Sequence, residues 1–239
     1  MTGVQTCALP ISTFIGQGLE GYTKDGSPTK ISWPARPSGL AMDAAGNLFI
    51  ADNGKHRILK VKKDGNIATV AGNTESGFSG DGGPAISARL WSPSGVAVDS
   101  TGNVYIADTG NRRIRKLATN GIISTVAGSD NRGKWEDGIR AINSSLAFPS
   151  GVAVDEQGNL YIADTGYACV RKVMTNGIIV TIAGTLRPGY SGDGGPAAAA
   201  QLNGPVAVAV DAKGNLYVAD SENNAIRMLR PIPSNRLLN

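Results

Sequence analysis

Short runs of apolar residues recur along the chain and are separated by turn residues. In the stretch from 95 to 127 the runs cover 96–98, 104–107, 114–117 and 122–127, and most of their residues are β-branched or aromatic. Runs of this length and composition are typical of β-strands. An Asn-Gly pair at 120–121 stands before the last run and favours a tight hairpin turn. The pattern therefore predicts four short antiparallel strands.

The same pattern returns every 56 residues. Two series of aspartates mark the repeat, at Asp43, Asp99, Asp155 and Asp211 and at Asp52, Asp108, Asp164 and Asp220. We therefore divide the chain into a leader (1–11), four units (12–67, 68–123, 124–179 and 180–235) and a tail (236–239). A lone four-stranded sheet leaves both of its faces exposed, so such units must stack. The expected fold is all-β, a β-propeller of four visible blades.

The two ends of the repeat region differ from its middle. Pro231 and Pro233 stand where the other units have the hairpin and the fourth strand, so the last unit should stop after three strands. Residues 12–16 resemble a fourth strand without the three strands that precede it in the other units. This extra strand could complete the three-stranded last unit, which is how a propeller ring closes without an unpaired sheet edge. Residues 1–11 look like a translated sequencing adapter, and we exclude them from the fold.

Several segments of the second unit match one family pattern: GVAVD at 95–99, GNVYIAD at 102–108, NRRIRK at 111–116 and STVAG at 124–128, with the connector FSGDGGPA at 78–85. They resemble the NHL-repeat family, in the long-connector form found in bacterial proteins and teneurins. The resemblance implies a β-propeller, most often of six blades, so we expect a fragment of a larger ring. It also favours a bacterial protein that is secreted or periplasmic, while the adapter-like leader indicates a metagenomic fragment. It fixes no single function.

Composition narrows the possible functions. Charged residues make up 18% of the chain and no apolar run is long enough to span a membrane, which indicates a folded protein without a membrane span. Two Cys and one His exclude a disulfide scaffold and a metal site with several imidazoles. The net charge is +4, but Arg115, Arg171 and Arg227 alternate with apolar residues as on a solvated strand face. Because no aromatic platform accompanies them, we do not expect nucleic acid binding.

Several motifs that suggest chemistry have a simpler structural interpretation. The G-x-G-x-x-G at 16–21 has no helix after it, so we interpret it as a connector turn. The series Asp52, Asp108, Asp164 and Asp220 ends each second strand, where a carboxylate accepts from loop amides. The connector aspartates Asp81 and Asp193 each supply one carboxylate, too few for calcium. We interpret Cys169 as a small strand residue. No catalytic residue, metal or cofactor is predicted.

The loop between the second and third strands differs from unit to unit. Ligand recognition needs residues that vary between blades, and these loops should share one propeller face. The candidate ligand-binding residues are Lys55, His56, Asn111, Arg112, Tyr167, Asn223 and Asn224. We expect His56, the only histidine, to be exposed. A second candidate contact, where the connector departs from its pattern, comprises Arg132, Lys134 and Trp135.

These observations favour a non-enzymatic propeller that serves as a scaffold or sensor and binds a protein, a peptide or a glycan. Two alternatives stay open. One is a lyase or hydrolase with an axial metal site completed by missing blades, because related lyase propellers are expected to use histidines near their axis. The other is an RNA-binding NHL propeller.

Overall fold

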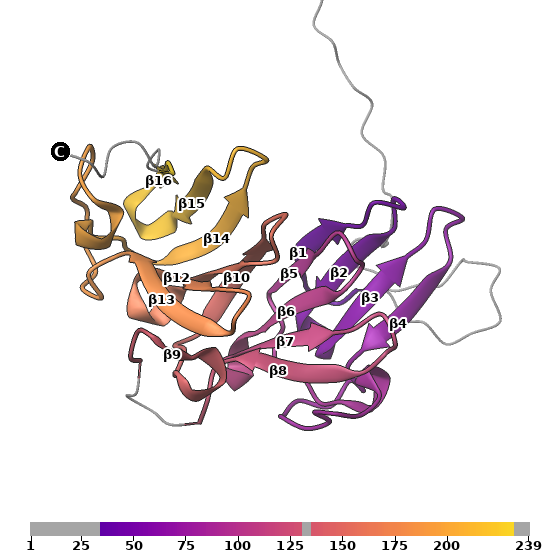
Figure 1. Cartoon of the computed structure of the whole chain (residues 1–239). Coiled ribbons are helices and arrows are strands. Elements are labelled where there is room, and N and C mark those ends of the chain that lie inside the picture. Colours follow the sequence, from indigo (N-terminus) through magenta and orange to yellow (C-terminus); the bar gives the residue numbers. More distant parts are fainter. Residues whose placement is uncertain (1–33, 131–134, 232–239) are drawn as a thin grey trace, which may run out of the picture.

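Four antiparallel sheets follow one another along the chain in the computed structural model, which describes residues 34–130 and 135–231 (Figure 1). The first sheet holds β1 (Pro37–Met42), β2 (Leu48–Asp52), β3 (Arg57–Val61) and β4 (Ile67–Ala71). The second holds β5 (Gly95–Val98), β6 (Val104–Asp108), β7 (Arg113–Leu117) and β8 (Ile123–Ala127). The third holds β10 (Pro149–Val154), β11 (Leu160–Asp164), β12 (Cys169–Val173) and β13 (Ile178–Ala183), with β9 (Ile139–Arg140) added beside β13. The fourth holds β14 (Pro205–Val210), β15 (Leu216–Asp220) and β16 (Ala225–Leu229).

The strands of the second sheet lie within one residue of their predicted bounds. The predicted hairpin is also confirmed, because Gly121 has a φ of +83° and the Asn120 side chain accepts a hydrogen bond from the Ile122 amide. The fourth sheet has three strands within the described residues. The positions where a fourth strand would follow lie beyond residue 231, outside the described residues. The short strand β9 was not predicted, since two residues of a connector carry no periodic signal.

The innermost strands of successive sheets pack side by side, in the order β1, β5, β10, β14. The sheets are thus arranged as blades of a β-propeller. Within the described residues, β14 and β1 are not among the strand pairs that pack extensively. The strand predicted at 12–16 lies outside the described residues, as does the glycine motif at 16–21.

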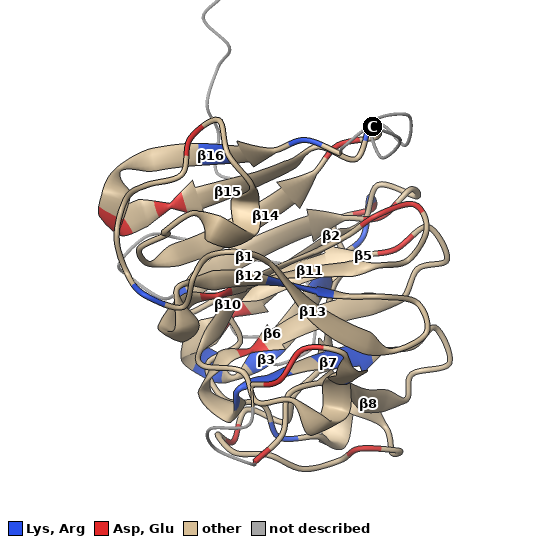
Figure 2. Cartoon of the chain, turned by 60° about the vertical axis from the view of Figure 1, so that its left-hand side comes forward, with Lys and Arg blue, Asp and Glu red and all other residues tan. Residues whose placement is uncertain are grey.

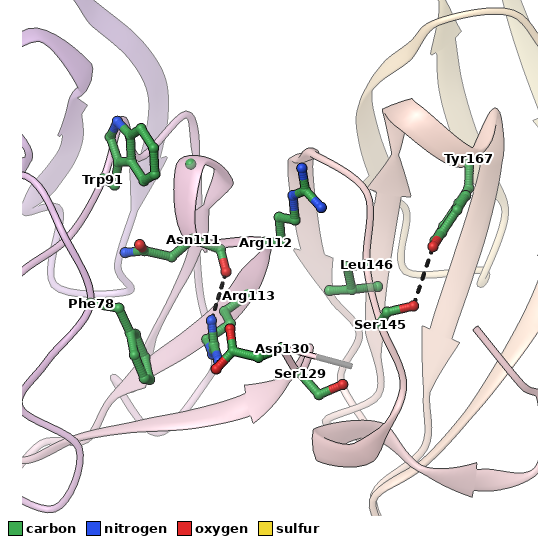
Figure 3. Close-up of a pocket in the computed structure, with 11 residues that line it drawn as sticks. Phe78, Trp91, Asn111, Arg112, Arg113, Ser129, Asp130, Ser145, Leu146 and Tyr167 are labelled. Carbon is green, nitrogen blue, oxygen red and sulfur yellow. Dashed lines mark hydrogen bonds and ion pairs between the residues drawn. The ribbon is translucent and has the colours of Figure 1, made fainter. Parts of the chain in front are cut away.

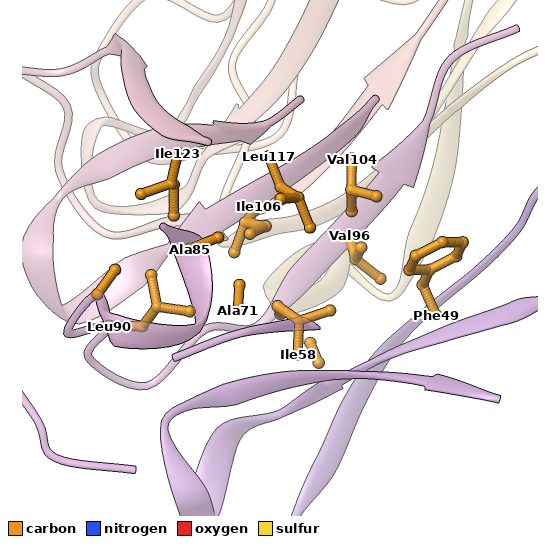
Figure 4. Packing of buried hydrophobic residues seen from close by; sticks show 12 residues of the cluster. Phe49, Ile58, Ala71, Ala85, Leu90, Val96, Val104, Ile106, Leu117 and Ile123 are labelled. Carbon is orange, nitrogen blue, oxygen red and sulfur yellow. The ribbon is translucent and has the colours of Figure 1, made fainter. Parts of the chain in front are cut away.

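The hydrophobic core lies between adjacent blades. Figure 4 shows the cluster in which Phe49 and Ile58 of the first sheet face Val104 and Ile106 of the second. Leu90, from the connector between the two sheets, packs into the same cluster. Equivalent clusters lie between the second and third and between the third and fourth sheets. Within the described residues, the second and third sheets therefore bury both faces against neighbours, and the first and fourth sheets each bury one, as expected for sheets that cannot be stable alone.

A ladder of hydroxyl groups joins the innermost strands. The hydroxyl of Ser38 donates to the carbonyl of Ser94 at 3.0 Å, and that of Ser94 donates to the carbonyl of Ser150 at 2.9 Å. The hydroxyl of Ser150 donates to the carbonyl of Val206, also at 2.9 Å. Glycine permits this approach, because a Cβ on Gly95 would lie 2.6 Å from the Ser150 carbonyl oxygen. Each of these bonds fixes one sheet directly against the next.

The arginines of the third strands are buried, so the expectation of a solvated strand face was wrong. Arg115 and Arg171 are fully buried, and Arg227 is 9% exposed. The connector folds over this strand face and supplies a carboxylate, so that Asp81 lies 2.7 Å from Arg115 and Asp193 lies 2.8 Å from Arg227. Figure 2 marks the positions of Lys, Arg, Asp and Glu along the fold. The connector aspartates are therefore ion-pair partners and not only turn residues.

Candidate functional site

The loops between the second and third strands all have the same backbone form. Each begins with a single 3-10 turn, at Asn53–Lys55 (η1), Thr109–Asn111 (η3), Thr165–Tyr167 (η5) and Ser221–Asn223 (η7). The residue after each turn adopts a left-handed conformation; these residues are His56, Arg112, Ala168 and Asn224. This shared backbone presents different side chains at equivalent places in the four blades.

A buried aspartate ends the second strand of every sheet and ties the loop to the connector. Its Oδ1 accepts the backbone amide of the residue 17 positions earlier, at 2.8 Å for Asp52, 2.7 Å for Asp108 and Asp164, and 2.6 Å for Asp220. An Asx turn would instead use an amide of the loop that follows. The carboxylate thus holds the end of the connector against the loop.

A cavity of about 210 Å³ lies between the second and third sheets (Figure 3). Three of the predicted residues line it: Asn111, Arg112 and Tyr167. The other lining residues are Phe78, Trp91, Gly110, Arg113, Ser129, Asp130, Ser145 and Leu146. The structure therefore brings together candidate residues of two adjacent blades.

The two arginines of the cavity differ in their partners. Arg113 lies 2.6 Å from the Asp130 carboxylate and 3.9 Å from the centre of the Phe78 ring, so its charge is compensated. The guanidinium of Arg112 lies 4.8 Å from the centre of the Phe148 ring, and no ion pair within the described residues involves it. Arg112 thus offers a cation to a molecule in the cavity.

The third blade departs from its neighbours at Tyr167. In the second blade the amide nitrogen of Asn111 donates to Asp108 at 2.8 Å, and Asn223 does the same for Asp220 in the fourth. Tyr167 occupies this position in the third blade, and its hydroxyl lies 3.2 Å from the hydroxyl of Ser145. It makes no equivalent bond to Asp164.

Three buried polar atoms of the third blade have no hydrogen-bond partner within the described residues: Oδ2 of Asp164 and Nε and Nη1 of Arg171. Buried polar groups are usually paired, so this part of the third blade is unusual. Burial raises the pKa of Asp164 to about 7, while the Ala147 amide and the Arg171 charge oppose the rise. Burial likewise raises the pKa of Asp108 to about 6. Hydrogen bonds from Trp91, Asn111 and Arg115 and the charge of Arg115 oppose this rise.

The remaining candidate residues lie elsewhere. His56 is half-buried and its Nδ1 accepts the Ser92 amide at 3.1 Å, so the expectation that it is exposed was wrong. Lys55, Asn223 and Asn224 belong to the loops of the first and fourth blades and do not line the cavity. Trp135 is partly exposed, and its carbonyl accepts from Arg171. Arg132 and Lys134 lie outside the described residues.

Sequence reasoning missed the connector residues of the cavity, above all Phe78 and Trp91. The comparison of repeat units would have found Trp91, because Ala35, Ala147 and Asn203 occupy its position in the other units. Trp91 lies in the connector between β4 and β5, outside the variable loops. The connectors contribute to the cavity as much as these loops do.

Groups suited to metal or covalent chemistry are sparse in the described residues, which contain no cluster of three or more His, Cys, Asp or Glu able to hold a metal ion. Cys169 is fully buried, and burial together with the nearby Asp164 raises the pKa of its thiol. A buried neutral thiol is a poor nucleophile. No helix in this part of the chain is long and apolar enough to span a membrane.

Family comparison agrees with the blade pattern. A model described as the teneurin NHL domain matches residues 74–136 and 131–187, and one described as the NHL repeat matches 35–61 and 202–227. The chain belongs to the NHL-repeat family. The matches to this NHL-repeat chain include segments of all four sheets.

The relatives of this NHL-repeat chain are longer proteins. Human Teneurin-1 is 32% identical over 219 residues, which cover 81% of this chain and 8% of the relative. Chicken NHL repeat-containing protein 2 is 30% identical over 236 residues, which cover 89% and 32%. The chain thus spans less than a third of the length of these curated relatives.

Solved structures share the fold of this NHL-repeat chain. A protein of unknown function from Bacteroides thetaiotaomicron superposes with a TM-score of 0.65 at 24% identity, over 80% of this chain and 46% of that one. An auxiliary nutrient binding protein from Bacteroides ovatus gives 0.60 at 17%, over 82% and 48%. A streptogramin B lyase gives 0.56 at 14%, over 83% and 55%. At these identities the likeness concerns the fold alone.

Proposed function

We propose that this NHL-repeat chain is a non-enzymatic binding domain that holds a polar ligand in the cavity between its second and third blades. The observation that carries the proposal is the meeting of Arg112 and Tyr167, which differ from their counterparts in the other three blades, with Asn111 and the aromatic residues Phe78 and Trp91. Residues that vary over a constant scaffold are where recognition is expected.

The chemistry of the cavity suits a ligand with both apolar and hydrogen-bonding surfaces. Trp91 is half exposed and offers an aromatic face. Arg112 supplies a cation, while Ser129 and Tyr167 supply hydroxyl groups. Ligand cavities of drug-like size begin near roughly 300 Å³, so a volume of about 210 Å³ fits one side chain of a peptide or one ring of a glycan. The rest of such a ligand would lie along the loop face.

The composition of the cavity favours binding over catalysis. Among the described residues its lining contains no His and no Cys, and Asp130, its acidic residue, is paired with Arg113. General acid–base catalysis needs a group that can exchange a proton with the substrate. The lining thus offers hydrogen bonds and stacking, which are the means of recognition.

The proposal is tested by titrating the protein with panels of defined peptides and oligosaccharides and following tryptophan fluorescence and heat. Arg112→Asn and Tyr167→Asn introduce residues that other blades carry at these positions, so the loop backbone should be preserved. We expect each variant to weaken binding of a ligand at least about tenfold, which corresponds to roughly 1.4 kcal/mol. Asn224→His, the matched control in the fourth blade, should leave binding unchanged.

Equal binding by all four proteins would show that the ligand does not use this cavity. A loss of binding in Asn224→His equal to that in Arg112→Asn would place the site on the whole loop face and not between the second and third blades. If no peptide or oligosaccharide of the panels binds, the ligand class proposed here is wrong.

A further inference from the structure

A second cavity, of about 230 Å³, lies between the first and second sheets. Five apolar side chains form most of its wall, those of Phe49, Val70, Val104, Leu117 and Ala118. Three of them, Phe49, Val104 and Leu117, also belong to the buried cluster of Figure 4. The cavity reaches the surface at the hairpin between β7 and β8, where Gly121 is exposed. It is thus an apolar space that opens from solvent into the packing between two blades.

This cavity and the one between the second and third sheets lie at opposite ends of the strands. Phe49 and Val104 lie at the start of β2 and β6, whereas the variable loops follow Asp52 and Asp108 at the ends of these strands. Within the described residues the two cavities share no lining residue. Binding in one can therefore be measured independently of binding in the other.

The open space results from one short side chain in the second sheet. Ala118 follows the last residue of β7, and the same position of the other units carries a long side chain, in Lys62, Met174 and Arg230. In the third sheet Met174 is half-buried. The second unit lacks all side-chain atoms beyond Cβ at this position, so a space remains beside Phe49.

The neighbouring pair Val104 and Leu117 leaves this space open. The two residues lie opposite each other on β6 and β7, as Leu160 and Val173 do on β11 and β12. Each pair consists of one leucine and one valine, so the exchange alters the shape of the wall and leaves its volume the same. The loss of volume at position 118 is not compensated by this pair. Apolar concave space of this kind is the usual form of a small-molecule site.

The charge beside the cavity is compensated. Lys60 contributes to the lining, and its Nζ lies 3.6 Å from the Asp43 carboxylate. Phe49 stands where the other three sheets have tyrosine, and in the second sheet the hydroxyl of Tyr105 donates to Asp99 at 3.1 Å. The wall at Phe49 lacks this hydroxyl. The lining therefore favours an uncharged, apolar occupant, because an ion would lose its hydration without gaining a partner.

We propose that this cavity binds a small, uncharged molecule that carries one aromatic ring or an aliphatic group of similar size. An apolar cavity of roughly 150 Å³ can hold benzene, so about 230 Å³ accommodates one ring with a short substituent. The occupant is a free molecule, because Phe49 and Val104 are at most 4% exposed and are reached only from between the two sheets. A side chain held on the backbone of a folded partner enters such a space less readily.

A titration with toluene, followed by two-dimensional NMR of the backbone amides, tests the proposal. In the wild type we expect toluene to shift the amide resonances of Gly102, Val104 and Gly121 and to raise the melting temperature. Ala118→Met introduces the residue of the third sheet and should weaken toluene binding at least about tenfold, because it fills the space that the ring would occupy. Ala198→Met adds the same side chain at an exposed position of a connector and should bind toluene as the wild type does.

Benzoate and benzylammonium test the uncharged character of the ligand. Both have a ring of the same size, and we expect each to bind at least about tenfold more weakly than toluene because its charge must be desolvated. Binding of either ion as tight as that of toluene would contradict the proposed ligand class. Arg112→Asn should bind toluene like the wild type, which separates this site from the cavity between the second and third sheets.

The folding of Ala118→Met has its own measurement. Without toluene this variant should keep the circular dichroism spectrum of the wild type and melt at a higher temperature, because the added side chain fills a cavity. The amide shifts of the wild type test the location of the site even where the variant fails to fold. The proposal is overturned if toluene does not bind the wild type, if its shifts are centred on Arg112, or if folded Ala118→Met binds it unchanged.

Discussion

The guanidinium of Arg115 lies 3.3 Å from the carboxylate of Asp108, and both side chains are fully buried. A second carboxylate, that of Asp81, lies 2.7 Å from the same guanidinium and is partly exposed. One buried cation thus joins the end of a strand to the connector that covers it. Removing one partner of a buried pair leaves an uncompensated charge, which costs far more than the loss of a surface pair.

We expect Arg115→Leu to lower the free energy of unfolding by about 3–5 kcal/mol at pH 8. Urea denaturation measures the change. Arg89→Leu is the matched control, because Arg89 pairs with Glu75 on the surface and such pairs contribute about 0–1 kcal/mol. Similar losses in the two variants would contradict the structural role of the buried pair.

Asp164 should make the stability of the protein depend on pH. An unfolded aspartate ionises near pH 4, whereas burial raises the pKa of Asp164 to about 7. Between these values the native state binds more protons than the unfolded state, so the free energy of unfolding contributed by Asp164 falls as the pH rises from about 4 to 7. Above pH 7 this contribution is constant.

Denaturation curves at several pH values check this dependence. In Asp164→Asn the side chain is neutral at every pH, so the slope between pH 4 and 7 should be smaller than in the wild type. An unchanged slope in Asp164→Asn would mean that Asp164 is ionised throughout this range.

Tyr167→Asn should stabilise the protein, although it is expected to remove ligand binding. Asparagine at this position donates to the strand-end aspartate in the second and fourth blades, at 2.8 Å in both. The same bond would satisfy Oδ2 of Asp164, and a hydrogen bond to a carboxylate contributes about 1.5–3 kcal/mol. Thermal denaturation measures the gain. The reverse exchange, Asn111→Tyr, should destabilise the second blade, and a gain of stability there would contradict the argument.

Gly95→Ala should destabilise the junction between the second and third blades. The added methyl group would lie 2.6 Å from the Ser150 carbonyl oxygen, and overpacking of this kind costs about 1–3 kcal/mol. Chemical denaturation gives the value. In the fourth sheet Ala207→Gly should cost no more than about 1 kcal/mol, the usual effect of glycine in a strand. A neutral Gly95→Ala would show that the inner strands can separate freely.

The periodicity of the sequence was sufficient to predict the described strands of the four sheets except β9. Apolar runs and an Asn-Gly turn identify the strands of the second blade, and the 56-residue spacing transfers them to the other blades. The burial of Arg115 could not be inferred in this way. Its partner Asp81 lies 34 residues earlier, and only the path of the connector brings the two together.

The candidate site could be predicted only in part, again because it depends on contacts between residues far apart in the chain. The variable loops supplied Asn111, Arg112 and Tyr167, but no local pattern indicates which adjacent loops share a cavity. Trp91 lies in a connector, and how near it comes to Tyr167 depends on how the second and third blades pack. Contacts between sheets depend on residues far apart in the chain, and strand periodicity does not encode them.

Three hydrophobic clusters each join two adjacent sheets, while a smaller one, around Ile50, Leu59 and Val61, belongs to the first sheet alone. Four sheets in a row therefore have three interfaces, and each additional unit adds one sheet together with one whole interface. The cooperativity of unfolding should then grow with the number of units, since an internal sheet can open only by breaking two interfaces, whereas a terminal sheet breaks one. Amide hydrogens of the second and third sheets should consequently exchange with solvent more slowly than those of the fourth.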